Sequence, residues 1–236
     1  MPNDDTPAAA PDSQSREDVD VLAAIGLRLD GPDIGQIEAA CARIARRIVD
    51  EKLRIVGFVP SDDQVAVLPV AIHLGLALCR LTGATVAVVD ANVRYPGLAE
   101  ISRGPEMERA SERWRAGPGS NEAAAGQPAA RTNHETSAFA TRWLKGSLAL
   151  LSPPSVERAG EVVPQLARAL LDGSDMFAHV LVDLTGFELL GEHASAAACM
   201  DGVALIGRAH RTRERELVEL ASLMPHGRFM GVLLVG

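Results

Sequence analysis

The chain has 236 residues, of which 47% are hydrophobic and 23% charged, a composition typical of a globular protein rather than of a disordered or fibrous one. Aromatic residues make up only 3%, which leaves little material for base-stacking platforms, and the formal net charge of −8 disfavours a general polyanion-binding protein. No stretch reaches the roughly 18 consecutive apolar residues of a membrane span, and the acidic start is unlike a signal peptide, so we expect a cytoplasmic protein.

The first half of the chain predicts a tail followed by a strand–helix–strand unit. Residues 1–20 are rich in Pro, Ala, Ser and Asp and are expected to form a disordered acidic tail ahead of a single domain over 21–236. From Pro32, apolar residues recur at three- and four-residue spacings, which predicts an amphipathic helix. Short apolar strands are expected at 53–59 and 85–90, separated by a helix with Pro69 in its first turn and Gly83 just past its end.

In the second half, a long segment interrupts this pattern before it resumes. Residues 103–137 are rich in Gly, Pro, Ala, Ser and charge, and we expect a flexible insertion there. Because strands that are apolar on both faces need helices on both sides, the sequence predicts an α/β fold with a doubly wound, mostly parallel sheet of about six strands. The later strands are expected at 147–152, 179–184, 202–209 and 231–236, and the later helices at 156–173, after 184, and at 212–224.

Three segments in this order carry the functional signal. They are the strand–turn–helix at 55–81, the sequence VVDANVRYPGL at 88–98, and VDLTG at 182–186. Their residues and spacing resemble the deviant-Walker P-loop proteins of the MinD/ParA class. Within that class they are most similar to the bacterial tyrosine kinases, the cytoplasmic ATPase partners or domains of polysaccharide co-polymerases. The resemblance covers about residues 33–236 and implies a P-loop NTPase-like fold.

The phosphate-binding loop departs from the family pattern. Alignment on the downstream helix places the family's lysine at Val67 and its magnesium-binding hydroxyl at Leu68, and the loop before them contains Ser61, Asp62 and Asp63 but no glycine. Backbone N–H groups need glycines to wrap around phosphates, and two aspartates place negative charge where a triphosphate would lie. We expect ATP and magnesium binding to be lost, leaving no cofactor, and we expect Asp62 to cap the helix instead.

The magnesium side of the motif is preserved in part. Asp90 and Asp183 match the family's aspartates, whereas Asn92 replaces the second aspartate of the middle motif. In a catalyst these carboxylates would hold a metal or position water; alternatively, they are strand-end residues that bind loop amides. Arg94 and Pro96 keep the shape of the motif and are candidates for a partner surface. The histidines have no metal-ligand spacing, so no metal site is predicted.

Two arginine-containing segments have alternative interpretations. Arg43 and Arg46 keep the spacing of the family's ring-assembly motif, but Ala40 occupies its glutamate position. The segment therefore indicates either a homo-oligomer surface or the solvated face of an amphipathic helix. Arginines over 208–215 alternate with glutamates that can pair along a helix, so a solvated helix is favoured over nucleic-acid binding.

These observations lead to a functional hypothesis. The chain resembles a non-catalytic, tyrosine-kinase-like pseudo-ATPase that regulates polysaccharide biosynthesis or export, such as that of an exopolysaccharide or capsule. Its expected partner is the cytoplasmic segment of a membrane polysaccharide co-polymerase, which would hold the chain at the inner membrane without direct insertion. The alternative is a degenerate MinD/ParA-like positioning or pilus-assembly protein. In both cases the chain is not expected to be an enzyme, whereas a third interpretation is an active ATPase that uses an unorthodox phosphate loop.

Overall fold

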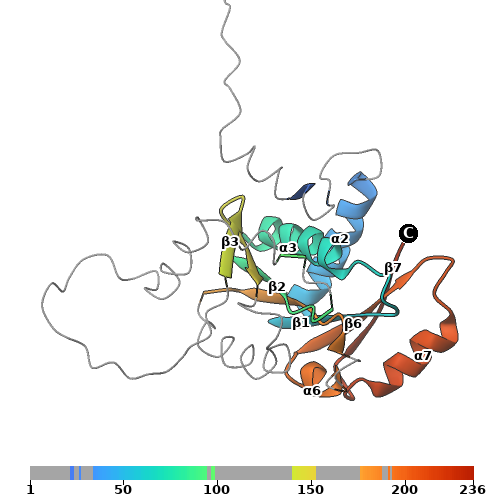
Figure 1. The fold of residues 1–236 in the computed structure, drawn as a ribbon. Helices are drawn as coiled ribbons and strands as arrows, with labels where there is room; N and C mark the ends of the chain where they lie inside the picture. The colour runs from blue at the N-terminus through green and yellow to red at the C-terminus, as the bar shows by residue number, and fades with distance from the viewer. Residues whose placement is uncertain are drawn as a thin grey trace, which may run out of the picture.

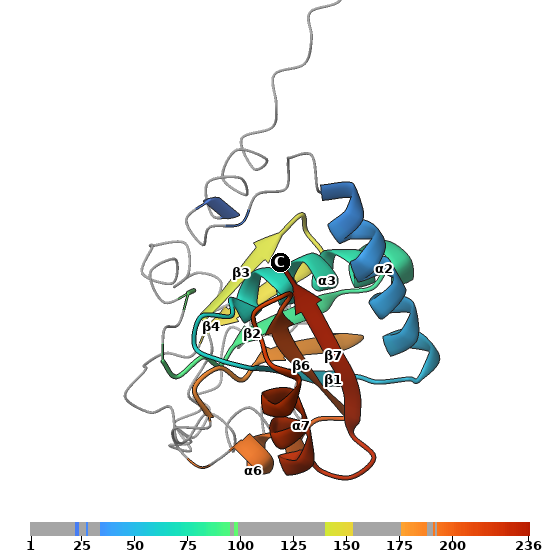
Figure 2. The same cartoon turned by 90° about the vertical axis from the view of Figure 1, so that its right-hand side faces the viewer.

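A seven-stranded sheet with helices on both faces forms the described part of the chain (Figures 1 and 2). From one edge to the other, the strands are β3 (Ala140–Leu144), β4 (Leu148–Ser152), β2 (Val86–Asp90), β5 (His179–Asp183), β1 (Ile55–Pro60), β6 (Gly202–Arg208) and β7 (Phe229–Val235). Every neighbouring pair is parallel except β3 with β4. This confirms the predicted doubly wound, mostly parallel α/β fold. The computed structural model describes residues 22–23, 27, 34–94, 97–98, 140–152, 176–187, 191 and 193–236. The predicted tail, the predicted insertion and the predicted helix over 156–173 lie outside these residues.

Apart from β3, the described elements follow the predicted order along the chain. They are α2 (Ile34–Asp50), β1 (Ile55–Pro60), α3 (Val67–Thr82), β2 (Val86–Asp90), β3 (Ala140–Leu144), β4 (Leu148–Ser152), β5 (His179–Asp183), α6 (His193–Ala198), β6 (Gly202–Arg208), α7 (Glu214–Leu223) and β7 (Phe229–Val235). No helix among the described residues has both the length and the apolar character needed to cross a bilayer.

The core has two parts, one on each face of the sheet. Alternation along β1 directs Val56 and Phe58 to the side covered by α2 and α3, and Val59 to the side covered by α6 and α7. The other central strands alternate in the same way, so nearly all their side chains are buried. This double burial is why these strands are continuous apolar runs in the sequence.

The termination of α3 follows the sequence signal. Gly83 adopts a left-handed conformation with φ 68° and donates its backbone N–H to the Cys79 carbonyl over 2.9 Å. This geometry is the usual helix end at a glycine. It delivers the chain directly into β2, whose last residue is Asp90.

One strand was missed in the sequence. β3 pairs antiparallel with β4 through a hairpin in which Leu144 faces Leu148. The turn between them places Lys145 and Gly146 at positive φ, 48° and 70°. Such a turn has a recognisable sequence signal, a glycine between two apolar runs. The composition of the preceding segment led us to extend the irregular region nearly to this hairpin.

Candidate functional site

Four parallel strands end side by side at one edge of the sheet. β1, β2, β5 and β6 end at Pro60, Asp90, Asp183 and Arg208, and we call the strand ends with the loops that follow them the carboxyl edge. In doubly wound folds, ligands bind at this edge. The strand register places Asp90 directly opposite Asp183, so the structure brings together two residues that lie 93 positions apart in the sequence.

The loop after β1 is organised by its own side chains and by β6. The Ser61 amide donates to the Ile206 carbonyl over 2.7 Å, and its hydroxyl lies 3.0 Å from that of Thr212. The Gln64 amide donates to Asp62 Oδ1 over 2.9 Å, forming a side-chain-closed turn. The prediction that Asp62 caps α3 is therefore wrong. The N-cap is Ala66, which makes no side-chain cap, because the Asp62 carboxylate is used four residues earlier in the turn.

The two positions that the resemblance assigns to lysine and hydroxyl belong to the hydrophobic core. Val67 and Leu68 are the first two residues of α3 and are 2% and 7% exposed. Both belong to the hydrophobic cluster that α2 and α3 form with the sheet. A Cβ added at Gly97 would come within 2.8 Å of Leu68 Cδ2, so the segment after β2 packs directly against Leu68. An apolar side chain thus fills the space at the start of α3 that faces Asp90.

Asp90 and Asp183 are both buried at the centre of the carboxyl edge. Asp90 accepts the Leu98 amide over 2.7 Å and the Asn92 amide over 3.3 Å. Asp183 Oδ1 accepts both the amide of Thr185, over 2.9 Å, and its hydroxyl, over 2.5 Å. Asp183 Oδ2 is buried and has no hydrogen-bond partner among the described residues. Most of the carboxylate oxygens are therefore committed to holding the loops, as expected for strand-end residues that bind loop amides.

Burial governs the protonation of this pair. Desolvation raises the pKa of Asp90 to about 6, although the amides of Leu98 and Asn92 oppose the shift. Desolvation also raises the pKa of Asp183 to about 7, and the nearby Asp90 adds to this rise. Two buried carboxyl groups that face each other favour a state in which at least one retains its proton.

The segment after β2 connects three of the loops. Arg94 Nη1 lies 3.3 Å from Asp63 Oδ2, which joins this segment to the loop after β1. The Val93 amide donates to the Thr185 carbonyl over 3.1 Å, and a Cβ added at Gly186 would come within 2.7 Å of Val93 Cγ2. Asn92 Oδ1 accepts the Arg94 amide over 2.9 Å. Arg94 thus has a positioning role, whereas Pro96 lies outside the described residues.

Arg43 and Arg46 lie elsewhere, on α2. Arg43 and Arg46 are both exposed, and no contact in the described part of the chain joins either to the carboxyl edge. The predicted site residues therefore fall into two groups, one at the strand ends and one on the helix that covers a face of the sheet.

Four residues that shape the carboxyl edge were not predicted from the sequence. Gly97 and Gly186 allow close approach of the loops, while Thr185 holds Asp183 and Thr212 contacts Ser61. Gly186 and Thr185 belong to the VDLTG segment, so their proximity to Asp183 could have been anticipated. The contact from Thr212 crosses 151 residues, and no local pattern signals it.

The residues at this edge fit a nucleotide and its metal poorly. Magnesium prefers a near-octahedral set of oxygen ligands, and phosphates need a lysine and free backbone amides. Within the described ranges, no group of three or more His, Cys, Asp or Glu side chains is placed to hold a metal ion. Among the described residues of this edge, Asp183 Oδ2 is the only carboxylate oxygen that is buried without a partner, and Asp183 lies opposite a second acidic residue, Asp90.

Comparisons with known proteins place the chain by its fold. No protein-family model and no curated protein matches it. Among solved structures, it is similar to the BceF tyrosine kinase domain, with a TM-score of 0.60 and 16% identity over 92% of this chain and 81% of that one. It is also similar to the kinase domain of the Escherichia coli tyrosine kinase ETK, with a TM-score of 0.54 and 15% identity over 83% of this chain and 75% of that one. A ParA family ATPase from Chlorobium tepidum matches with a TM-score of 0.50 and 16% identity over 77% of this chain and 73% of that one. The described chain therefore has the P-loop-like α/β fold that bacterial tyrosine kinase domains share with ParA-type ATPases.

Proposed function

We propose that this chain is a non-catalytic, tyrosine-kinase-like protein that regulates polysaccharide biosynthesis or export by binding a membrane polysaccharide co-polymerase. The fold comparison supports the kinase-like architecture. The polysaccharide context and the partner come from the resemblance of the VVDANVRYPGL segment and its neighbours. In this proposal the nucleotide site has become a structural element that holds the loops of the carboxyl edge in one arrangement.

The observation that carries the proposal is the packing of Leu68. In an ATP-binding loop, the residue at this position must present a hydroxyl to magnesium. Here an apolar side chain is 7% exposed and packs on Gly97, while Asp90 is engaged by the amide of Leu98 next to it. Binding a nucleotide would require this packing to be broken and an aspartate-rich loop to accept a triphosphate.

A thermal-shift experiment with ATP and magnesium tests the loss of nucleotide binding. A ligand that binds only the folded state at 100 times its Kd adds about 2.7 kcal/mol, which raises the Tm of a domain of this size by several degrees. We expect no shift at millimolar ATP. A shift that is present in the wild-type chain and absent in Asp90→Asn would refute the proposal, because it would show nucleotide bound at the carboxyl edge.

The proposed partner contact lies around Asp90 to Pro96, of which residues 90–94 are among those that the structure describes. Because a partner responds to ATP only if ATP favours one conformation, loss of nucleotide binding should make the interaction constitutive. We expect co-purification with membranes that contain the co-polymerase, equally with and without ATP, and weaker recovery of Arg94→Glu. Arg215→Glu is the matched control, since Arg215 is exposed on α7. Equal recovery from membranes with and without the co-polymerase would contradict this partner.

The fold also supports a second candidate function. The similarity to a ParA family ATPase is compatible with a degenerate positioning or pilus-assembly protein. The genes beside the one that encodes this chain distinguish the two proposals. Glycosyltransferases with a two-span membrane protein would support the polysaccharide role, whereas partition or pilus components would support the positioning role.

A further inference from the structure

Strand β7 (Phe229–Val235) forms an open edge in the described part of the chain. It pairs with β6 on one side and is the last strand of the sheet on the other. The Ala209 amide donates to the Val235 carbonyl over 2.7 Å, so alternation along the strand directs the backbone groups of Leu234 and Val232 away from β6. None of its residues, FMGVLLV, is charged or proline, although such residues usually protect an edge from pairing.

Large apolar side chains are exposed along this same strand. Phe229 is 39% exposed, Val232 38% and Leu234 61%. Their register partners on β6 are Val203, Leu205 and Gly207, so all three side chains project from the face covered by α6 and α7. Figure 2 shows β7 in front of β6 with α2 beside it. An added strand would cover both the free backbone groups and these side chains.

On the opposite face, a cavity of about 160 Å³ lies between β7 and α2. It exists because two small residues face each other: Ala204 on β6 is the register partner of Gly231 on β7, where the ladder is irregular. Gly231 has φ 125°, a conformation that side chains rarely adopt, and a Cβ added there would contact nothing within 4 Å. Apolar side chains from α2 and β1, including Ile44, Ile48 and Phe58, form the remaining walls.

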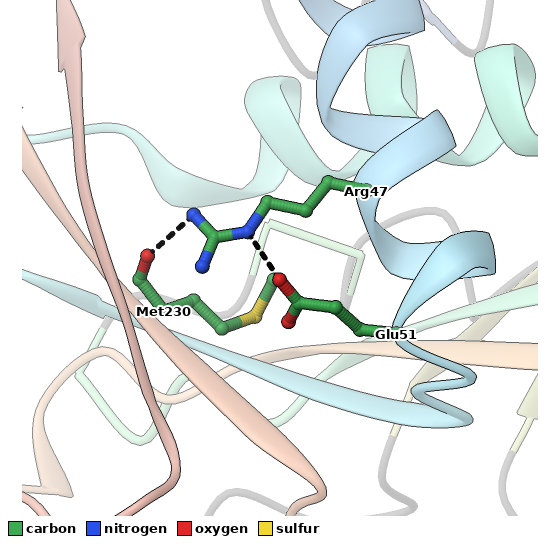
Figure 3. A network of polar contacts seen from close by, with 3 residues as sticks. All are labelled: Arg47, Glu51 and Met230. Carbon is green, nitrogen blue, oxygen red and sulfur yellow. Dashed lines mark hydrogen bonds and ion pairs between the residues drawn. The ribbon is translucent and has the colours of Figure 1, made fainter.

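Arg47 of α2 also lines this cavity and is held against β7 (Figure 3). Its Nη1 donates to the Met230 carbonyl over 2.8 Å, and its Nε donates to Glu51 Oε1 over 2.7 Å. A guanidinium has five N–H donors, so the described contacts leave donors available, and the exposed pair with Glu51 is weak enough to exchange. The segment from Arg43 to Lys52 carries four basic and two acidic residues in a chain of net charge −8, so this corner is locally basic.

We propose that the β7 edge and the adjoining cavity bind an extended segment of a protein partner that carries an apolar residue and an acidic residue two positions apart, so that both side chains project from the face that α2 covers. The segment adds a strand to β7, one of its apolar side chains enters the cavity beside Gly231, and a carboxylate binds Arg47. This arrangement combines main-chain pairing with a side-chain pocket, as in other cases of strand addition. A second copy of β7 fits less well, because its uncharged sequence offers no carboxylate to Arg47. The proposal does not depend on the polysaccharide role.

Peptide binding tests this proposal directly. The probe is a fluorescent seven-residue peptide with blocked ends and the sequence Thr-Val-Leu-Val-Glu-Val-Thr, in which leucine and glutamate share one face of the strand. Its binding to the full chain is measured by fluorescence anisotropy. One comparison peptide has lysine in place of glutamate, and another carries N-methyl groups on alternate residues, which removes the N–H donors of one edge. We expect binding of the glutamate peptide and at least about tenfold weaker binding of both others, because charge pairing and strand pairing are each required.

Variants of the chain locate the site. Arg47→Glu and Leu234→Lys are both expected to weaken binding about tenfold, and both change exposed side chains, so the fold should persist. Ala204→Leu fills the cavity from inside and should have a similar effect if circular dichroism shows that it folds. Arg215→Glu is the matched control, because Arg215 forms an equivalent exposed pair with Glu219 on α7 but does not line the cavity. It should bind the peptide as the wild-type chain does.

Three outcomes would overturn the proposal. The first is no binding of the glutamate peptide at millimolar concentration. The second is binding that Arg47→Glu and Leu234→Lys leave unchanged. The third is sedimentation that shows a wild-type dimer dissociated by Leu234→Lys, which would make a second copy the occupant of this edge.

Discussion

The carboxyl edge of the central strands and the outer edge of β7 use their residues in opposite ways. At the carboxyl edge, Asp90 and Asp183 are buried and each accepts loop amides, and Leu68 closes the space at the start of α3. At β7, apolar side chains are exposed and a small cavity separates the strand from α2. The edge where doubly wound folds bind ligands is therefore packed in the described part of the chain, whereas the exposed apolar side chains and the cavity lie at β7.

This contrast shows that the location of a site within a fold and the capacity to bind there are separate properties. Parallel strands place their carboxyl ends together whatever the side chains are. Whether a ligand enters depends on the residues that fill the space, and here these are Val67, Leu68 and the loop carrying Gly97. The following predictions test whether the two edges differ in stability as well as in accessibility.

The largest difference is expected between two leucines. Leu68→Ala should lower the free energy of unfolding by about 2–5 kcal/mol, because it removes a buried side chain and leaves a cavity. Leu234→Ala, at a position 61% exposed, should change it by less than about 0.5 kcal/mol. Urea denaturation of both variants measures the difference. Equal losses would show that the start of α3 is not packed as described.

The buried aspartates should make stability depend on pH. Their folded-state pKa values, about 6 for Asp90 and about 7 for Asp183, exceed the ordinary value of 3.8, so the folded chain retains protons that the unfolded chain releases. The stabilisation is complete below pH 3.8 and is lost as pH rises through 6 and 7. We expect the free energy of unfolding to fall by roughly 2–4 kcal/mol between pH 5 and pH 8 because of this pair.

Urea denaturation of the variants Asp183→Asn and Asp50→Asn, each at the same two pH values as the wild-type chain, checks this expectation. Asp183→Asn removes one of the two buried charges and should reduce the loss, whereas Asp50→Asn removes an exposed carboxylate at the end of α2. The same pH dependence in Asp183→Asn and the wild-type chain would rule out the pair as its source.

Two matched ion pairs provide a smaller test. Arg47 with Glu51 and Arg215 with Glu219 are both exposed pairs four residues apart on a helix. Arg47 additionally donates to the Met230 carbonyl and so fastens α2 to β7. Arg47→Ala should therefore cost about 0.5–1.5 kcal/mol more than Arg215→Ala, measured by thermal unfolding. Equal costs would mean that α2 is not held to β7 by this contact.

The smallest effect is expected at the carboxyl edge itself. Arg94→Gln removes the ion pair with Asp63, in which the Arg94 side chain is 30% exposed and the Asp63 side chain 48%. The substitution should lower the free energy of unfolding by no more than about 1 kcal/mol. Because salt screens such a pair, the effect should shrink at 1 M NaCl. A loss that is larger and independent of salt would indicate that Arg94 holds the loops chiefly through packing.

Local sequence patterns were sufficient for most of the architecture. The apolar runs of β1, β2, β4, β5 and β6 and the end of α3 at Gly83 follow from period and turn chemistry. The final strand begins two residues before its predicted start, at Phe229, because the irregularity at Gly231 hides its beginning. The β3 hairpin was missed since it adjoins a long segment of low apolar content.

The candidate site could be predicted only in part. The strand-end positions of Asp90 and Asp183 follow from the sequence, because each aspartate ends an apolar run. The use of Asp62 in its own turn, rather than as the cap of α3, could not be predicted, since both uses need the same short-range pattern. The contact between Ser61 and Thr212 depends on the pairing of β1 with β6.

The sequence by itself determined the order of the described strands and helices other than β3, the two-sided burial of the sheet, and the missing lysine, hydroxyl and glycines of the loop after β1. These properties depend on residue type and on spacing over a few residues. Only the tertiary structure decided that Asp90 faces Asp183, that Leu68 packs on Gly97, and that Ala204 and Gly231 leave a cavity beside Arg47. Each of these depends on strand register, which juxtaposes residues far apart in the chain and is set by the packing of the whole sheet.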